Sequence, residues 1–305
     1  MSNNPTVLTD APLPLPLFRR GKVRDVYDLG DKLLIVSTDR ISAFDVILPC
    51  GIPEKGKVLN QLSAFWFEET AHIIPNHLIK AIDNSVILSE VKNLSGHSEE
   101  LTDCLIGRSM FVNKAERIPV ECVVRGYLSG SAWEEYKETG KVGHIHLPSG
   151  MKESQELPQP IFTPTTKSDT EHDRPLTTQD IKSLGVEDIF KELEQKSLLI
   201  YGYARDYART RDIIIADTKF EFGFIKGKLA IIDELLTPDS SRFWDVSQYE
   251  VGHSQPSFDK QPVRDWLSAS GWNKKPPAPM LPPGVIERTS KRYREVYSRL
   301  TGKGL

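Results

Sequence analysis

Residues 213–224, IIIADTKFEFGF, place an acid, a base and an acid at every second position of a strongly apolar segment. Because successive side chains of a β-strand point to opposite faces, the three phenylalanines share one face, and Asp217, Lys219 and Glu221 share the other. One interpretation is an exposed sheet face with an internal ion pair. The other is a strand that carries charged groups into a reaction site.

The next apolar run, KLAII, predicts the second strand of a hairpin and is followed by an acid pair that begins at Asp233. A two-residue turn would place Asp233 opposite Phe220, on the apolar face. A three-residue loop at 225–227, with its final glycine in the left-handed conformation, would place Asp233 opposite Lys219 instead. We expect the three-residue loop, because it brings Glu221 and Asp233 onto one face of the hairpin.

Two carboxylates with no softer ligand nearby suit Mg²⁺, a cation that prefers oxygen ligands and keeps several waters. The phosphate oxygens of a nucleotide would complete such a site. Lys219, between the acids, could hold a phosphate or a substrate carboxylate. The pattern therefore favours phosphate chemistry, with Glu221 and Asp233 as the metal ligands.

Three other polar segments suit anion recognition. GKVRD places Lys22 and Arg24 on one side of a strand, where two cations can meet a polyphosphate, although a basic edge strand has the same residues. VVRGYLSGS runs from a strand through Arg125 to Ser131 at a helix start, which is either an anion site or a simple capped turn. In DSSRFW, Arg242 is either a second anion clamp or part of a turn cap.

The elements that position these groups are predicted from periodicity, caps and turn residues. We expect strands at 23–29, 33–37, 78–91 and 108–124, and helices at 59–71, 131–139, 186–211 and close to the C-terminus. Ser131 and Glu134 predict a capping box for the second helix, and Gly140 predicts its end. Residues 148–175 indicate a loop, in which His172 is given no catalytic role. This order predicts an α+β protein with a β-rich front half.

Composition excludes several classes of protein. The chain of 305 residues is 39% hydrophobic and 27% charged, with a formal net charge of −3, which gives no support for a nucleic-acid or membrane partner. The N-terminus lacks the pattern of a signal peptide. The three cysteines lack metal-ligand spacing, so we expect a reducing, cytoplasmic compartment. We expect a monomer, because the sequence shows no exposed apolar helix stripe that could pack against a second chain.

Six motifs then occur in order: GKVRDVYD, STDRISAFDV, PVECVVRGYLSGS, TPTTKSDTEHD, DTKFEFG and DELLTPDSSRFW. Together they resemble the phosphoribosylaminoimidazole-succinocarboxamide synthase (SAICAR synthetase) family, from about residue 15 to the last helix. The resemblance implies a carbon–nitrogen ligase of purine biosynthesis. It would join L-aspartate to the carboxylate of 5-amino-1-(5-phosphoribosyl)imidazole-4-carboxylate (CAIR) through an acyl phosphate, with ATP as co-substrate and Mg²⁺ as the metal.

The resemblance also implies the architecture. Residues 1–115 would form a nucleotide-binding lobe with an antiparallel sheet resembling the small lobe of kinases. Residues 116–305 would form a larger mixed α+β domain for substrate and metal, with a docked last helix and ATP in the cleft between the two parts. The order of substrate binding, and whether phosphorylation precedes amine attack, stay open.

The family's site residues carry over to matching positions of this sequence. ATP would contact Lys22, Arg24, Ala115, Glu116 and Arg117. CAIR would contact Arg125, Ser131 and Arg242 through its phosphoribosyl group and Asp239 near its imidazole, while Lys167 and Asp173 would line the acceptor site. Lys219 and Lys22 would act on the reacting groups, and Glu221 and Asp233 would bind Mg²⁺. Because DELLTPD is one residue longer than the corresponding motif of shorter relatives, Glu234 is an alternative to Asp233.

Two other functions share these features. A small-molecule kinase of the inositol-phosphate type would have the same front lobe and acidic hairpin, but it would transfer phosphate to its final acceptor. A non-catalytic nucleotide-binding module would not need both Glu221 and Asp233. Release of phosphate only with CAIR and aspartate together would distinguish the ligase.

Overall fold

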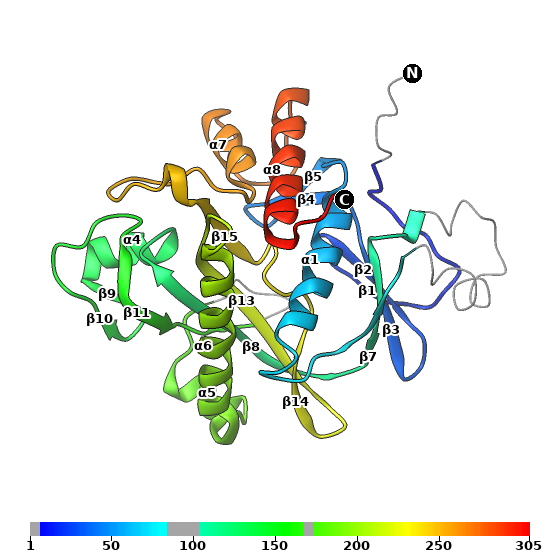
Figure 1. Ribbon diagram of the computed structural model, residues 1–305, viewed down its shortest axis with the longest axis horizontal. Coiled ribbons are helices and arrows are strands. Elements are labelled where there is room, and N and C mark those ends of the chain that lie inside the picture. Colours follow the sequence, from blue (N-terminus) through cyan, green and yellow to red (C-terminus); the bar gives the residue numbers. More distant parts are fainter. Residues whose placement is uncertain (1–6, 84–103, 168–173) are drawn as a thin grey trace.

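A computed structural model describes residues 7–83, 104–167 and 174–305 (Figure 1). Its strands are β1 (Leu17–Arg20), β2 (Arg24–Asp28), β3 (Lys32–Ser37), β4 (Arg40–Ala43), β5 (Val46–Gly51), β6 (Leu78–Ala81), β7 (Ser109–Asn113), β8 (Glu116–Tyr127), β9 (Lys141–Val142), β10 (Ile145–His146), β11 (Glu156–Phe162), β12 (Thr165–Thr166), β13 (Ile213–Ile225), β14 (Lys228–Ile232) and β15 (Ser241–Asp245). Its helices are α1 (Lys55–Glu69), α4 (Ser131–Thr139), α5 (Thr178–Ser183), α6 (Glu187–Arg209), the short 3₁₀ helix η2 (Val246–Gln248), α7 (Gln261–Ala269) and α8 (Pro283–Thr301).

Two antiparallel sheets form the framework. The first has five strands in the order β1-β2-β3-β7-β6, and the second has six, with the path β11-β8-β13-β14 and with β12 and β15 paired to β8 and β13. The predicted hairpin at 23–37 is confirmed as β2 and β3. The chain passes from the first sheet to the second at residues 114–115, between β7 and β8. The α+β class is therefore confirmed.

The second sheet is buried by helix α6, which lies along it in Figure 1. Apolar residues of α6, such as Leu193 and Ile200, join Phe220 and Phe222 of β13 in the largest hydrophobic core, and all four are fully buried. The opposite face of β13 is thereby left for its charged residues. This is the arrangement that the alternation of residues 213–224 predicts.

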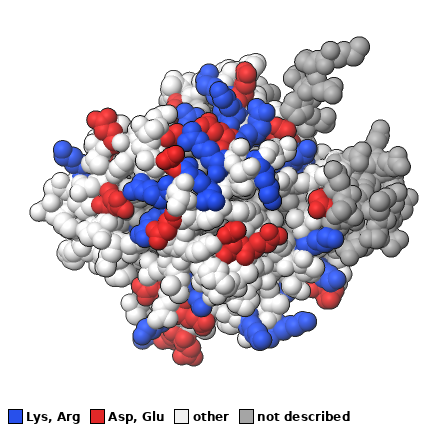
Figure 2. Space-filling view, in the orientation of Figure 1, with Lys and Arg blue, Asp and Glu red and all other residues white. Residues whose placement is uncertain are grey.

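The C-terminal helices pack back onto the N-terminal part of the chain. Helix α8 lies beside α1 in Figure 1, and Val263 of α7 and Val285 of α8 share a buried cluster with Ile41 and Ile52. The C-terminal helices therefore pack in one cluster with residues 41–52. Positive and negative side chains are mixed on the face in Figure 2, where Lys and Arg gather near its centre.

Several predicted boundaries are wrong, and the structure gives the physical reasons. The single strand expected at 108–124 is two strands in different sheets. Helix α1 begins at Lys55, earlier than expected, after Glu54 in a left-handed conformation (φ 64°), and Lys55 forms a buried ion pair with Asp239 that the local sequence does not show. Ser131 forms no cap, because Gly130 takes the N-cap position of α4 with φ 57°, whereas Gly140 ends that helix as predicted.

The expected loop at 148–175 contains two short strands. Both β11 and β12 pair with β8, so this segment extends the second sheet. Sequence reasoning also missed α5 and α7, which are short and lack a long apolar periodicity. The expected strand residues 84–91 lie outside the described part of the chain.

The predicted three-residue loop of the β13–β14 hairpin is wrong. Ile225 pairs directly with Lys228, so the turn holds only Lys226 and Gly227, with φ of 50° and 73°. Two successive residues with positive φ match the right-handed twist of the flanking strands. The positive φ of Gly227 is confirmed, but Lys226 adopts the left-handed region despite its side chain, which sequence reasoning did not anticipate.

Candidate active site

The charged face of β13 is neutralised from other elements, not from within the strand. Lys219 Nζ donates to Glu121 Oε1 of β8 at 3.1 Å, and Arg242 of β15 donates to Asp217. Glu221 forms an ion pair with Lys167, whose Nζ lies 2.9 Å from Glu221 Oε1. These residues therefore do not form an ion pair within the strand. Each charged residue of this face pairs with a residue of a different strand or loop.

Glu121 is a residue that the sequence interpretation missed. It is 4% exposed, and its Oε1 accepts from both Lys219 and Lys167, the latter at 3.0 Å. Burial opposes the charged form of Glu121, but the two lysines outweigh burial and lower its pKa. The available signal was an acid inside the apolar run PVECVV. Lys219, Glu121, Lys167 and Glu221 thus form a chain of alternating charges across the sheet.

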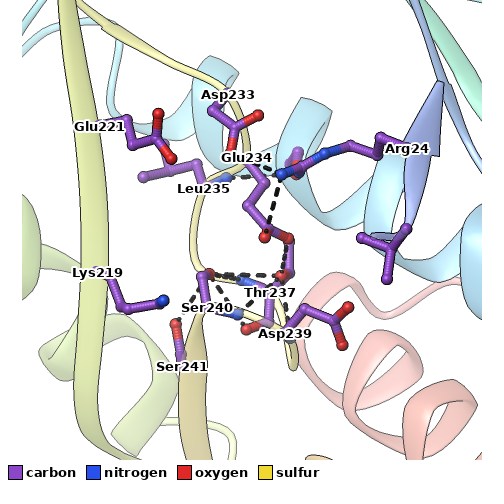
Figure 3. Close-up of polar contacts among 12 residues, drawn as sticks. Arg24, Lys219, Glu221, Asp233, Glu234, Leu235, Thr237, Asp239, Ser240 and Ser241 are labelled. Carbon is purple, nitrogen blue, oxygen red and sulfur yellow. Dashed lines mark hydrogen bonds and ion pairs between the residues drawn. The ribbon is translucent and has the colours of Figure 1, made fainter. Parts of the chain in front are cut away.

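Asp233 joins Glu221 by a route different from the predicted one. Because the turn has two residues, Glu221 pairs with Ile232. A regular continuation of β14 would therefore place Asp233 opposite Phe220. The strand instead ends at Ile232, and Asp233 adopts φ 67°. This left-handed residue redirects the chain, and in Figure 3 the carboxylate of Glu221 points toward Asp233, whose own carboxylate lies on the side of Arg24. The expected face is therefore reached by a local backbone conformation after the strand.

The pKa values of these two carboxylates shift in opposite directions. Burial and the charge of Asp233 raise the pKa of Glu221. Burial alone would raise the pKa of Asp233 as well, but Arg24 lowers it through an ion pair with an Nη2–Oδ2 distance of 2.6 Å. Glu234 turns away, because its Oε2 accepts from Thr237 Oγ1 at 2.5 Å (Figure 3). Asp233, and not Glu234, is therefore the acid that faces Glu221.

The residues expected to meet ATP lie in two places. Lys22 is half exposed and pairs with Asp45, whereas Arg24 at the start of β2 is largely buried against Asp233 and Glu234. Burial opposes the charge of Arg24, but Asp233 and Glu234 raise its pKa.

The predicted adenine segment, Ala115, Glu116 and Arg117, lies where the chain enters β8. A Cβ atom at Gly223 would lie 2.7 Å from the Glu116 carbonyl oxygen, so only glycine allows β13 to approach this segment so closely.

A cavity of about 460 Å³ adjoins the charged face of β13. Its lining includes six predicted site residues: Lys22, Arg125, Ser131, Lys219, Asp239 and Arg242. It also includes Glu121, Lys260 and Arg264, which sequence reasoning did not select. Glu234, the alternative metal ligand, also lines the cavity, whereas Arg24, Lys167, Glu221, Asp233 and the segment 115–117 lie outside this lining. Asp173 lies outside the described part of the chain.

Two arginines of the cavity share one carboxylate. Arg125 Nη1 lies 3.6 Å from Asp217 Oδ2, the atom that also accepts from Arg242. Arg125 also donates to Thr163 Oγ1 at 3.0 Å, and its Nη2 lies 3.5 Å from Ser131 Oγ. The charge of Asp217 raises the pKa of Arg242, whereas burial lowers that of Arg125. Two oriented guanidinium groups next to a hydroxyl form a geometry suited to a phosphate.

Asp239 closes another wall of the cavity. Lys55 Nζ donates to its Oδ2 at 2.7 Å, Lys260 Nζ lies 3.4 Å from the same oxygen, and Tyr293 OH donates to Oδ1 at 2.7 Å. Burial opposes the charge of Asp239, but Lys260 and Lys55 lower its pKa. Lys55 and Tyr293 were not predicted, because they come from helices far away in the sequence.

A cavity lined by lysine and arginine side chains, next to a pair of half-buried carboxylates, is typical of an enzyme that handles anionic substrates. The SAICAR synthetase sequence profile matches residues 17–279. The phosphoribosylaminoimidazole-succinocarboxamide synthase of Syntrophobacter fumaroxidans is 49% identical over 100% of this chain and 99% of its own. The chain belongs to the SAICAR synthetase family and is a carbon–nitrogen ligase of purine biosynthesis.

Solved structures agree with this assignment. The SAICAR synthase of Saccharomyces cerevisiae, complexed with SAICAR, has a TM-score of 0.87 and 43% identity, with coverage of 98% of this chain and 99% of that chain. A SAICAR synthetase in complex with ADP has a TM-score of 0.68 and 26% identity, with coverage of 94% and 98%. These matches do not favour the small-molecule kinase alternative. In the described residues, no helix is both long and apolar enough to span a membrane.

Proposed function

We propose that the cavity next to β13 binds CAIR and is the place where its carboxylate is activated by ATP and joined to L-aspartate. The observation that carries this proposal is the convergence of Arg125, Ser131, Lys219, Asp239 and Arg242 on one cavity. These residues come from three separate segments of the sequence, at 125–131, 219 and 239–242. The yeast relative, whose structure is a complex with SAICAR, supports a small-molecule substrate of this kind.

Arg125 and Arg242 are the proposed phosphate anchors of CAIR. Asp217 holds both guanidinium groups, so that they are oriented before the substrate arrives. Ser131 adds a hydroxyl next to Arg125. Asp239 lies on another wall, where its carboxylate could accept a hydrogen bond from the amino group on the imidazole ring.

Glu221 and Asp233 are the proposed ligands of Mg²⁺. The donor set fits, because the charge of Asp233 raises the pKa of Glu221, a repulsion that a divalent cation would relieve, and carboxylate oxygens are the ligands that Mg²⁺ prefers. Among the described residues no group of three or more His, Cys, Asp or Glu is arranged to hold a metal. Nucleotide phosphates and water would therefore supply the other ligands. The metal would neutralise charge on the phosphates.

The chemistry proceeds in two displacements. A CAIR carboxylate oxygen attacks the γ-phosphorus of ATP, and the bond to the bridging oxygen breaks to release ADP. The amine of aspartate then attacks the acyl phosphate carbon, phosphate leaves with the bonding electrons, and the amine loses a proton. Lys219 lies half exposed at the cavity wall, where its ammonium group can stabilise charge on the transferring phosphoryl group.

ATP is proposed to lie against Arg24, Lys22 and the segment 115–117, on the side of the first sheet. The relative in complex with ADP supports nucleotide binding in this fold. Lys167 is proposed to face the aspartate acceptor, because its ammonium group is held by Glu121 and Glu221 at the edge of the site. We further propose that the enzyme acts as a cytoplasmic monomer.

A phosphate-release assay tests the proposed function. The purified chain is supplied with ATP, Mg²⁺ and CAIR, with aspartate in one arm and without it in the other. We expect stoichiometric ADP, phosphate and SAICAR only in the complete arm. A stable phosphorylated product formed without aspartate would instead indicate a kinase.

A further inference from the structure

The C-terminal helix α8 contacts a carboxylate of the cavity wall through the side chain of Tyr293. Tyr293 is fully buried, and its hydroxyl donates to Asp239 Oδ1 at 2.7 Å. The family profile matches only residues 17–279, so this helix lies beyond it. The residue therefore connects a part of the chain outside the profile to a carboxylate that lines the cavity.

Asp239 is held at both oxygens. Lys55 Nζ, also fully buried, donates to Oδ2 at 2.7 Å from the first residue of α1. The same ammonium group lies 5.8 Å from the centroid of the Tyr293 ring. A carboxylate with one donor on each oxygen has a fixed orientation, because rotation about its terminal bond would break both hydrogen bonds. The two donors arrive on different helices.

The two helices are themselves fastened to each other. Ser290 Oγ of α8 donates to the Pro53 carbonyl oxygen at 2.9 Å, and Tyr297 OH donates to Gln61 Oε1 at 2.7 Å. Helix α8 therefore cannot shift along α1 without breaking contacts on either side of Tyr293. This anchoring gives the hydroxyl of Tyr293 a defined place behind Asp239.

We propose that Tyr293 is a positioning residue for CAIR, which holds Asp239 in the one orientation that meets the imidazole end of the substrate. This inference rests on the proposed function, in which Asp239 contacts CAIR. A tyrosine with a purely structural role would make the same hydrogen bond to Asp239. The experiment must therefore separate an effect on substrate recognition from an effect on stability.

The same helix offers a matched control. Tyr293→Phe and Tyr297→Phe each remove one buried hydroxyl from α8, but Tyr293 donates to Asp239 of the cavity wall, whereas Tyr297 donates to Gln61 of α1. Kinetic constants for CAIR, ATP and aspartate and the melting temperature are measured for both variants, at a temperature at which circular dichroism shows both to be folded. We expect Tyr293→Phe to lower kcat/KM for CAIR by roughly tenfold or more, the effect of losing one hydrogen bond to a charged group. The KM for ATP stays unchanged, and the melting temperature falls no further than in Tyr297→Phe.

Equal kinetics for the two variants, or an equal loss for CAIR and ATP in Tyr293→Phe, would overturn the positioning role. Asp239→Asn separates this failure from a failure of the proposed function. If Asp239→Asn lowers kcat/KM for CAIR and Tyr293→Phe does not, only the proposed role of Tyr293 is wrong. Normal CAIR kinetics in Asp239→Asn would instead show that Asp239 does not belong to the substrate site. In the double variant the two losses should not add, because both act through one carboxylate.

Discussion

Lys219 Nζ lies 3.1 Å from Glu121 Oε1, and the two residues belong to neighbouring strands of the second sheet. The lysine side chain is 45% exposed, whereas that of the glutamate is 6% exposed. The buried acid holds the lysine by its ammonium group, while the rest of the half-exposed side chain borders the cavity. This pair is therefore suited to present a positive charge to the cavity.

Lys219→Met tests whether that charge acts in the reaction. Methionine retains the length and packing of the stem but has no charge. We expect turnover to fall by roughly 10²-fold or more, the scale of losing one preorganised electrostatic contact, while the melting temperature changes little. Lys228→Met, on the exposed end of β14, is the control and should be close to wild type in both measurements. Near-normal turnover in a folded Lys219→Met variant would exclude the catalytic role.

Glu121→Gln tests the acid that holds the two lysines. The amide keeps the shape but loses the charge that Lys219 and Lys167 contact, so we expect a loss of roughly 1–3 kcal/mol in the free energy of unfolding. Because the folded-state pKa of Glu121 is below its ordinary value of 4.5, its contribution is fully present above that pH and is lost as the pH falls through the lowered pKa. Chemical denaturation at pH 7 and at lower pH should show the gap between the two proteins closing with acid. A gap that stays constant would contradict the assignment.

The second sheet shows what the sequence could and could not predict. Alternation along 213–224 is a local property, so the strand, its buried phenylalanines and its charged face follow from it. The partners of that face come from residues far away in the chain, such as Glu121 and Arg242, which no local pattern specifies. Tyr293 and Lys55 were missed for the same reason. The order of six motifs supplied the family, because a resemblance uses the whole chain at once.

The β13–β14 turn allows a test of backbone conformation at a position where the local sequence is misleading. Lys226 has φ 50° and makes the turn with Gly227. Lys226→Asn should stabilise the protein by a few tenths of a kcal/mol, because asparagine adopts the left-handed region more readily than lysine. Gly227→Val should cost roughly 1–2 kcal/mol, since a β-branched residue is strained there. Thermal unfolding of the two variants measures both effects. Destabilisation by Lys226→Asn together with stabilisation by Gly227→Val would show that the turn has another conformation.

Arg125→Lys and Arg242→Lys test the proposed phosphate anchors. Lysine keeps the charge but cannot make the two parallel contacts of a guanidinium group. We therefore expect the KM for CAIR to rise by roughly tenfold in each variant, with little change in the KM for ATP. Arg264→Lys, at the rim of the same cavity, provides a comparison for a cation that the proposal does not assign. Equal increases in the KM for CAIR and the KM for ATP would show that these arginines are assigned to the wrong ligand.

The last prediction decides between the two neighbouring acids at the end of β14. Asp233 faces Glu221, whereas Glu234 accepts a hydrogen bond from Thr237, so Asp233→Asn should weaken the metal site and Glu234→Gln should not. Replacing one of two carboxylate ligands should raise the Mg²⁺ concentration needed for half-maximal activity by roughly 10-fold or more. Glu221→Gln should behave like Asp233→Asn. Isothermal titration of Mg²⁺ with ADP gives the same comparison without turnover. If Glu234→Gln raised the requirement for Mg²⁺ and Asp233→Asn did not, the left-handed turn at Asp233 would serve only to pair that acid with Arg24, and the metal would belong to the next residue.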